Sequence, residues 1–210
     1  QDALNLIQYT RQSVFLTGKA GTGKSTFLRY VCENTKKKHV VLAPTGIAAI
    51  NAGGSTMHSF FKLPFYPLLP DDPNLSLQRG RIHEFFKYTK PHRKLLEQIE
   101  LVIIDEISMV RADIIDAIDR ILRVYSHNLR EPFGGKQLLL VGDVFQLEPV
   151  VKNRRTGNIE PLLSYTLFFL CQSIRPDRPG IHRTSKGIPP NRPRFCRRPR
   201  PYPEQYSRSG

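Results

Sequence analysis

The segment "GKAGTGKST", residues 18–26, has the residue types and spacing of a phosphate-binding loop. Gly18, Gly23, Lys24 and Ser25 fit the pattern G-x-x-x-x-G-K-[ST], with an apolar run before it and a helical pattern after it. Loop glycines let backbone N–H groups surround a phosphate, and the positive end of the next helix favours the same charge. We expect Lys24 to reach the β- and γ-phosphates of ATP and the Ser25 hydroxyl to bind Mg²⁺. The expected nucleotide contacts are Gly18, Gly21, Gly23, Lys24, Ser25 and Thr26.

Two acidic residues, Asp105 and Glu106, follow the apolar run "LVII" later in the chain. An aspartate at a strand end can hold Mg²⁺ through water, and an adjacent glutamate can polarise the water that attacks the γ-phosphate. Such a pair also occurs where helices begin, so Asp105 or Ser108 could help to start the next helix. In combination with a phosphate loop, the pair predicts the magnesium and water-activating residues.

The segment "GDVFQLEP" follows another apolar run and adds an amide and a carboxylate. Gln146 could sense the γ-phosphate, and Asp143 could fix the loop or the waters of the metal. The alternative is an ordinary polar loop. The expected catalytic residues are Lys24, Asp105, Glu106 and Gln146.

The segment "APTGIAAINAGGSTMHSFF", residues 43–61, combines hydroxyls, exposed backbone and an imidazole. Small polar residues suit the phosphates of a nucleic-acid strand, and an aromatic ring suits the face of a base. The alternative is that Phe60 and Phe61 belong to the core and that His58 is a buried polar group. His58 has no second histidine or cysteine at metal-ligand spacing. The candidate nucleic-acid contacts are Thr45, Gly46, Thr56, His58 and Ser59.

Four short apolar runs precede these polar segments and begin at Ser13, His39, Glu100 and Gln137. They are apolar without alternation, which is typical of strands buried on both faces of a parallel sheet. Helical patterns lie between them, so the sequence predicts a doubly wound α/β domain. Ligands of such a sheet bind beyond the carboxyl ends of the strands, where all four polar segments begin.

The segment 108–125 shows the clearest helical period in the chain. One stripe carries the apolar side chains, and we expect the charged residues to face away from the core. The expected apolar stripe comprises Val110, Ile114, Ile118, Ile121 and Leu122, and the expected outward face comprises Asp113, Asp116, Asp119 and Arg120.

The net charge of +14 is divided unevenly along the chain. Residues 1–151 contain 19 basic and 15 acidic residues, whereas residues 152–210 contain 13 basic and 3 acidic residues and 9 of the 17 prolines. The overall basicity therefore gives little support for DNA binding by the first segment. Cys32, Cys171 and Cys196 have neither metal-ligand spacing nor the pattern of a disulfide set.

No apolar run is long enough to span a membrane and no signal-peptide pattern opens the chain, so we expect a cytoplasmic protein without a membrane partner. Residues 62–91 are rich in proline and weakly periodic. They predict an insertion at the edge of the domain, without an assigned chemical role.

Together, the four polar segments resemble the Pif-type DNA helicases, within the superfamily-one group that also contains RecD and the TraA relaxases. The resemblance covers residues 12–151, and "PTGIAAINAGGSTMHSF" is its most specific part. It implies a RecA-like domain of a P-loop ATPase that moves 5′ to 3′ along single-stranded DNA. It also implies roles in replication, recombination, repair and telomere maintenance, with ATP and Mg²⁺ as cofactors and a monomeric state.

A helicase of this type needs a second RecA-like domain, and the sequence after Val151 shows no pattern of such a domain. We therefore expect the chain to be the ATP-binding half, with weak hydrolysis and little unwinding. Two other functions remain as alternatives: a P-loop ATPase that remodels or loads other factors without translocating, and a basic nucleic-acid-binding protein that acts through residues 152–210.

Residues 152–210 could be a disordered basic arm, a divergent domain or a reading-frame error. Back-translated from Asp177 and read one base late, the sequence can spell "IDLVSIELQKVYRQTDPVFV"; from Lys152 it can spell "KTDEREILNRFYPTPYFFSA". Both readings are amphipathic and balanced in charge, and "LQKVYRQ" resembles the next motif of the family. We interpret residues 152–210 as a frameshifted translation and expect them to be disordered.

Overall fold

The computed structural model describes residues 2–19, 21–68, 72–77, 81–143 and 181–185. The first elements along the chain are α1 (Asp2–Tyr9), β1 (Ser13–Thr17), α2 (Lys24–Asn34), β2 (His39–Ala43) and α3 (Gly46–Ala52). The next are β3 (Ser55–Thr56), α4 (Met57–Phe61), η1 (Pro73–Leu75), α5 (Arg81–Phe86) and α6 (Lys90–Gln98). The remaining elements are β4 (Leu101–Ile104), η2 (Ile107–Met109), α7 (Ala112–Tyr125), η3 (Pro132–Gly135), β5 (Gln137–Gly142) and β6 (Ile181–Ser185). Here η denotes a short 3-10 turn.

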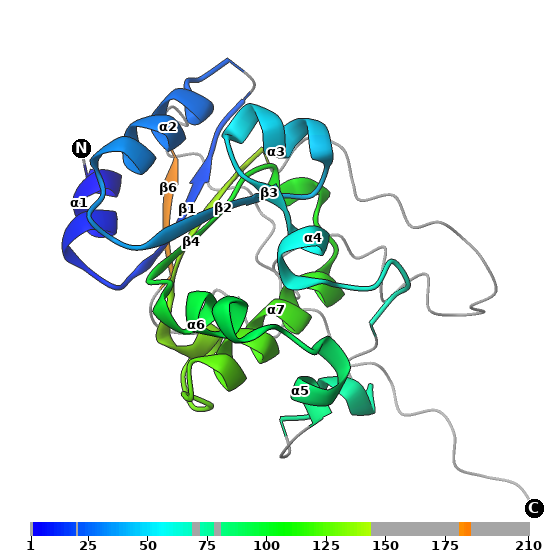
Figure 1. Cartoon of the computed structure of the whole chain (residues 1–210). Helices are drawn as coiled ribbons and strands as arrows, with labels where there is room; N and C mark the ends of the chain where they lie inside the picture. The colour runs from blue at the N-terminus through cyan, green and yellow to red at the C-terminus, as the bar shows by residue number, and fades with distance from the viewer. Residues whose placement is uncertain (1, 20, 69–71, 78–80, 144–180, 186–210) are drawn as a thin grey trace, which may run out of the picture.

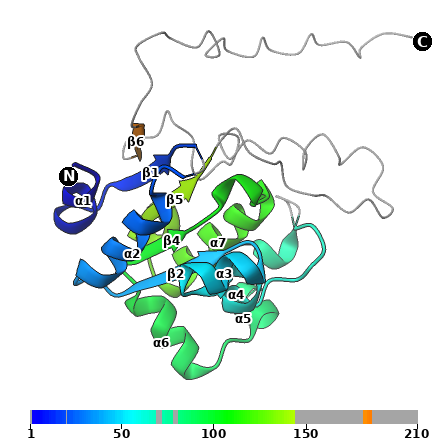
Figure 2. The ribbon, with the colours of Figure 1, turned by 90° about the horizontal axis from the view of Figure 1, so that it is seen from above.

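The strands form one sheet in the order β3-β2-β4-β5-β1-β6, which Figure 2 shows from β6 at the top toward β2. Every neighbouring pair is parallel. The four strands predicted from apolar runs are all present, and they form the contiguous centre β2-β4-β5-β1. Parallel pairing brings their carboxyl ends to one edge, so the prediction of a doubly wound α/β domain is confirmed.

Two hydrophobic clusters cover the two faces of the sheet, because successive strand side chains point to opposite faces. One cluster joins Ile103 and Leu139 to residues of α1 and α2, such as Val31. The larger one joins Ile104 and Leu140 to residues of α4 through α7. In Figure 1, α1, α2 and α3 accordingly lie on the upper side of the sheet, with α6 and α7 below it.

The proline-rich segment 62–91 contributes to the larger cluster rather than lying only at an edge. Its buried side chains are Leu63, Leu68, Leu75, Ile82, Phe86 and Tyr88. It is also tied to the end of α4 by a side chain, because Tyr88 Oη donates to the carbonyl of Phe61. The segment therefore folds as part of the domain core. No helix within the described residues has the length and apolar character needed to cross a membrane.

Residues 152–210 were predicted to be disordered, but five of them form β6, which pairs in parallel with β1 from Ser13↔Ile181 to Thr17↔Ser185. The expectation of disorder does not hold for these five residues, because they cover the backbone groups at that edge of β1. The rest of this segment lies outside the described residues.

The amphipathic prediction for α7 is confirmed for its apolar stripe and wrong for two of its acidic residues. Ile114, Ile118 and Ile121 are buried, but so are Asp113 and Asp119, at 6% and 5% exposure. The reason is that neighbouring loops fold over the expected outward face and their backbone N–H groups need acceptors.

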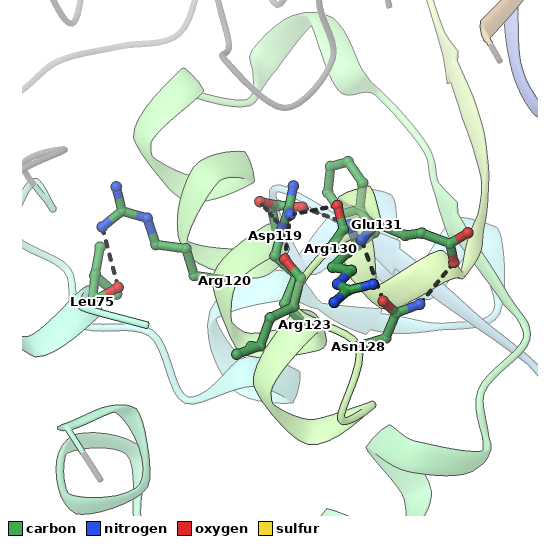
Figure 3. Close-up of polar contacts among 9 residues, drawn as sticks. Leu75, Asp119, Arg120, Arg123, Asn128, Arg130 and Glu131 are labelled. Atoms are coloured by element: carbon green, nitrogen blue, oxygen red, sulfur yellow. Dashed lines mark hydrogen bonds and ion pairs between the residues drawn. The ribbon is translucent and has the colours of Figure 1, made fainter. Parts of the chain in front are cut away.

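Asp119 organises the loop between α7 and β5, as Figure 3 shows. Its carboxylate accepts bonds from the Phe133 N–H and from Arg123 Nε, the latter at 2.8 Å. Arg123 also donates to the carbonyls of Leu129 and Arg130. The loop that leads into β5 is therefore held to α7 through one buried ion pair.

Replacing Asp119 with alanine should lower the free energy of unfolding by about 3 kcal/mol, because it leaves the largely buried Arg123 without its carboxylate partner and the Phe133 N–H without its acceptor. Urea unfolding followed by circular dichroism measures this change. The control is Glu33→Ala on the exposed face of α2, which should change the free energy of unfolding by less than about 0.5 kcal/mol. Equal stability of the two variants would show that the ion pair contributes little.

Candidate nucleotide site and nucleic-acid track

The phosphate loop joins β1 to α2 and has the backbone geometry that phosphate binding requires. Gly21 and Gly23 have φ angles of 79° and 84°, in the left-handed region that glycine adopts without strain. Gly23 caps α2, and the loop places the amino end of this 11-residue helix at the carboxyl edge of the sheet. Ser25 and Thr26 are exposed in the first turn of α2. The expected phosphate contacts are therefore gathered at the amino end of one helix.

The ammonium group of Lys24 lies inside the loop. Its Nζ donates to the carbonyl of Gly18 at 2.7 Å and to that of Lys19 at 2.9 Å. Thr22 Oγ1 donates to the same Lys19 carbonyl at 2.8 Å. These bonds hold a positive charge where the sequence predicts the β- and γ-phosphates.

Asp105 and Glu106 follow β4, at the same edge of the sheet. The Asp105 N–H donates to the Leu42 carbonyl at 2.9 Å, and Asp105 Oδ1 accepts from the Glu106 N–H at 2.9 Å. The backbone of Asp105 thus continues the pairing with β2, while its side chain is fixed by its neighbour. Glu106 adopts a left-handed conformation with φ of 50°, an uncommon conformation for a residue with a side chain. Such strain occurs often at functional sites.

Burial raises the pKa of both carboxyl groups. For Asp105, the Glu106 N–H and the Lys24 charge partly offset the effect of burial on the pKa. For Glu106, the charges of Asp105 and Asp143 raise the pKa further, while Lys24 lowers it. Lys24, Asp105 and Asp143 all lie close enough to Glu106 to affect its pKa, so these four residues form one electrostatic cluster. A raised pKa brings a carboxylate closer to the range in which it accepts a proton efficiently.

The end of β5 approaches the turn after β4 very closely. A Cβ atom at Gly142 would lie 2.8 Å from Ile107 Cγ2 and 3.1 Å from the Ile107 nitrogen. Only glycine fits between the two segments, and the next residue, Asp143, is buried at 6% exposure. Asp143 therefore lies close to Glu106, and its expected role in fixing the loop or the waters of the metal stays a prediction. Gln146, the predicted γ-phosphate sensor, lies outside the described residues.

The predicted nucleic-acid residues lie at the same edge, beyond β2 and β3. Ala43 pairs with Thr56 across the two strands, which brings the segments that start α3 and α4 together. Thr45 Oγ1 accepts from the Ala48 N–H at 3.2 Å, and Thr56 Oγ1 accepts from the Ser59 N–H at 3.1 Å. Both hydroxyls thus cap helices, and a hydroxyl that accepts one bond still carries an O–H donor. Gly46 and Ser59 are exposed.

His58 is half-buried, and its ring stacks on Phe65 with centroids 5.2 Å apart and planes 7° apart. Burial lowers the pKa of His58, as does the charge of Arg111, while Asp113 raises it. The imidazole is therefore neutral at neutral pH and has one N–H donor. Of the two neighbouring aromatics, Phe61 is buried and Phe60 packs against the core, so they belong to the core.

A scan against protein families matches residues 3–167 to the PIF1-like helicase model. The chain belongs to the PIF1-like helicase family. The match ends at residue 167, beyond the end of the resemblance at residue 151. The ATP-dependent DNA helicase PIF1 of Candida albicans is 36% identical over 168 residues, which cover 77% of this chain and 17% of that protein.

Solved Pif1 structures share the RecA-like fold. Bacteroides Pif1 in complex with ADP-AlF4 is 51% identical, with a TM-score of 0.64 over 73% of this chain and 33% of that chain. Bacteroides Pif1 bound to single-stranded DNA is also 51% identical, with a TM-score of 0.62 over 72% of this chain and 33% of that chain. The chain therefore spans about a third of these Pif1 structures.

Phe65 of this PIF1-like domain was not among the residues predicted from the sequence, although it is 88% exposed beside the predicted track. The doublet Phe65-Tyr66 between two prolines was the available signal. No helical or strand period marks which side of that segment is buried.

The raised pKa of Asp105 generates a prediction about stability. Because this pKa is higher in the folded chain than in the unfolded chain, folding binds protons between the two values, and the free energy of unfolding falls as pH rises through that window. Asp105→Asn removes this cost and keeps an acceptor for the Glu106 N–H. At neutral pH the variant should be more stable than the unchanged chain, and the difference should vanish below the ordinary pKa of aspartate.

Urea unfolding at several pH values measures this difference. The matched control is Glu84→Gln, an exposed carboxylate on α5, whose stability should follow that of the unchanged chain. An Asp105→Asn variant that is equally or less stable at neutral pH would contradict the assignment of burial as the dominant effect.

Proposed function

We propose that this chain is the ATP-binding part of a DNA helicase that translocates 5′ to 3′ on single-stranded DNA in repair, recombination, replication and telomere maintenance. The observation that carries the proposal is the electrostatic cluster of Lys24, Asp105 and Glu106 at the sheet edge that also holds the predicted track. One parallel sheet thus carries both the residues expected to bind ATP and those expected to bind DNA. Membership of the PIF1-like helicase family supports the same function.

The residues present fit ATP with Mg²⁺. The loop amides and Lys24 would hold the β- and γ-phosphates, and Ser25 and Asp105 supply the hard oxygen ligands that Mg²⁺ prefers. No group of three or more acidic, histidine or cysteine side chains able to hold a metal occurs in the described part of the chain. A magnesium ion bound through one carboxylate, phosphate oxygens and waters needs no such group. When bound, Mg²⁺ would neutralise part of the negative charge that develops on the phosphates.

Glu106 would act as the base that orients the attacking water. Burial and the neighbouring carboxylates raise its pKa, so its carboxylate is a better proton acceptor than an exposed one. Lys24 would stabilise the negative charge that develops on the transferred phosphoryl group. We propose Gln146 as the γ-phosphate sensor by analogy with the family pattern.

Hydrolysis by the 210 residues alone should be slow. In related phosphoryl-transfer enzymes an arginine supplied across the nucleotide cleft accelerates hydrolysis about 10³-fold or more. The resemblance assigns that arginine to a second RecA-like domain. We keep the monomeric state as a proposal, because one related structure concerns two coordinating Pif1 helicases at forked DNA.

We further propose that residues 152–210 are a translation in the wrong reading frame. The position of β6 supports this proposal. In the reading one base late, residues 180–185 become "VSIELQ", in which apolar and polar residues alternate as in a half-buried strand. The motif-like "LQKVYRQ" follows directly. The residues as written, "IHRTS", have no such alternation.

Lys24→Ala should weaken the binding of a fluorescent ATP analogue by about 10- to 100-fold, because it removes charge-assisted bonds to the phosphates. The control is Lys36→Ala, an exposed lysine beyond the other end of α2, which should bind the analogue normally. Equal binding by both variants would exclude Lys24 as a phosphate ligand.

The residual rate of ATP hydrolysis by the unchanged chain should rise when single-stranded DNA is added. A rate that does not change with DNA would favour the non-translocating ATPase.

Resequencing the gene from the codon of Val150 past that of Asp177 should reveal an inserted or missing base relative to the intact family frame. Transcript sequencing is the control against an error confined to one DNA read. If both agree on the frame as written, the frameshift proposal is wrong. The basic segment then needs a deletion test: its loss should abolish salt-dependent DNA binding only if that segment binds DNA itself.

A further inference from the structure

The loop after α4 exposes an aromatic pair between two buried anchors. Leu63 and Leu68 are buried, at 4% and 1% exposure, whereas Phe65 and Tyr66 are 88% and 53% exposed. A single exposed apolar residue is common on protein surfaces. Phe65 differs from such residues because the backbone on both sides of it is fixed, and because it lies next to the predicted nucleic-acid track.

The downstream anchor is a buried ion pair at the start of α7. The Leu68 N–H donates to Asp113 Oδ2 at 3.0 Å. Arg111 holds the same carboxylate with two bonds, from Nε to Oδ1 at 2.9 Å and from its terminal nitrogen to Oδ2 at 2.7 Å. Both side chains are largely buried, at 15% and 3% exposure. A two-bond arginine–carboxylate pair fixes geometry as well as charge.

The upstream anchor is the end of α4. Phe61 is buried, and its carbonyl accepts a bond from the hydroxyl of Tyr88. Leu63 N–H donates to the His58 carbonyl at 3.0 Å, which closes the helix. The segment from residue 62 to residue 67 is therefore short and held at both ends.

The Phe65 ring lies flat against His58, with an interplanar angle of 7°. Since Phe65 is 88% exposed, the imidazole covers only a small part of the ring, and the ring face turned away from His58 is open to solvent. His58 follows the capping hydroxyl of Thr56 and precedes the exposed Ser59, both expected to contact phosphates. Lys62, at the start of the loop, is exposed and adds positive charge. An open aromatic face beside hydroxyls and a cation is the combination found where single strands bind.

We propose that Phe65, backed by His58, is a stacking platform for one base of the single strand whose phosphates lie along α3 and α4. This inference rests on the proposed DNA track and adds a base contact to it. The contact does not select a sequence, because every base has a face that can stack. The competing occupant is another protein surface that covers Phe65, and the experiment below separates the two.

The chain contains no tryptophan, so Phe65→Trp places a single fluorescent reporter at the proposed platform. Binding of an oligothymidylate to the full chain should quench its emission, because the indole stacks on a base. An oligonucleotide of the same length that lacks bases should bind through its phosphates without this quenching. Tyr9→Trp is the matched control, because Tyr9 is 80% exposed on α1, away from the track. Its emission should not respond to either oligonucleotide.

Phe65→Ala should weaken oligothymidylate binding by about 5- to 150-fold, which corresponds to the stacking of one base, and leave binding of the base-free strand unchanged. Phe65→Tyr should bind like the unchanged chain. Fluorescence anisotropy measures the affinities, and ATP-analogue binding confirms that each variant is folded.

The outcomes separate this inference from the proposed function. If the unchanged chain binds oligothymidylate but Phe65→Trp emission does not change and Phe65→Ala binds equally well, the platform is wrong and the track stands. If the unchanged chain does not bind oligothymidylate, both are overturned. If Phe65→Ala weakens binding of both strands equally, Phe65 supports the fold of the track and does not contact a base.

Discussion

The pairing of β4 between β2 and β5 is the constraint on which the rest of the structure depends. The four residues of β4 are completely buried, and each face of this strand supplies one of the two hydrophobic clusters. Because the neighbouring strands are parallel to it, all their carboxyl ends reach the same edge. The phosphate loop, the acidic pair, Asp143 and the α3–α4 segment are thus gathered by backbone pairing rather than by contacts among themselves.

This arrangement imposes an electrostatic cost. Burial raises the pKa of Asp105 and Glu106, the charges of Asp105 and Asp143 raise the pKa of Glu106 further, and the Lys24 charge lowers the pKa of both Asp105 and Glu106. Glu106 adds a left-handed backbone. Such costs are tolerated where the rest of the fold determines the geometry, here through the strand pairing and the close approach at Gly142.

The central strands, the phosphate loop and the acidic pair could be predicted from the sequence, because their signals are local. An apolar run without alternation and a fixed glycine–lysine spacing identify elements without knowledge of their partners. The roles of Asp113 and Asp119 could not be predicted. A helical period places them outside, and only the loops that fold over α7, which supply the Leu68 and Phe133 N–H groups, make them buried acceptors.

Gln137 was hidden from prediction in the same way. It opens β5 within an apolar run, yet its amide donates to the carbonyls of Leu6 and Gln12 and accepts from Lys37. These three partners are distant in sequence, so no local pattern reveals them. The exposure of Phe65 was hidden for a similar reason. Phe61 is buried and Phe60 packs against the core, whereas Phe65 lies in the loop after α4 and is exposed, and no local pattern distinguishes the three.

The anchoring of the aromatic loop has a consequence for binding. A flexible loop that carries an aromatic residue loses conformational freedom when a ligand orders it, and this loss offsets part of the stacking energy. The Leu68–Asp113 bond and the buried side chains on either side fix the loop before any ligand binds. Asp113 also lies only one short turn and the start of α7 beyond Glu106. Glu106, the proposed base, and the loop that would hold a base are therefore joined by a short stretch of chain that is anchored by the buried Ile107 and Val110.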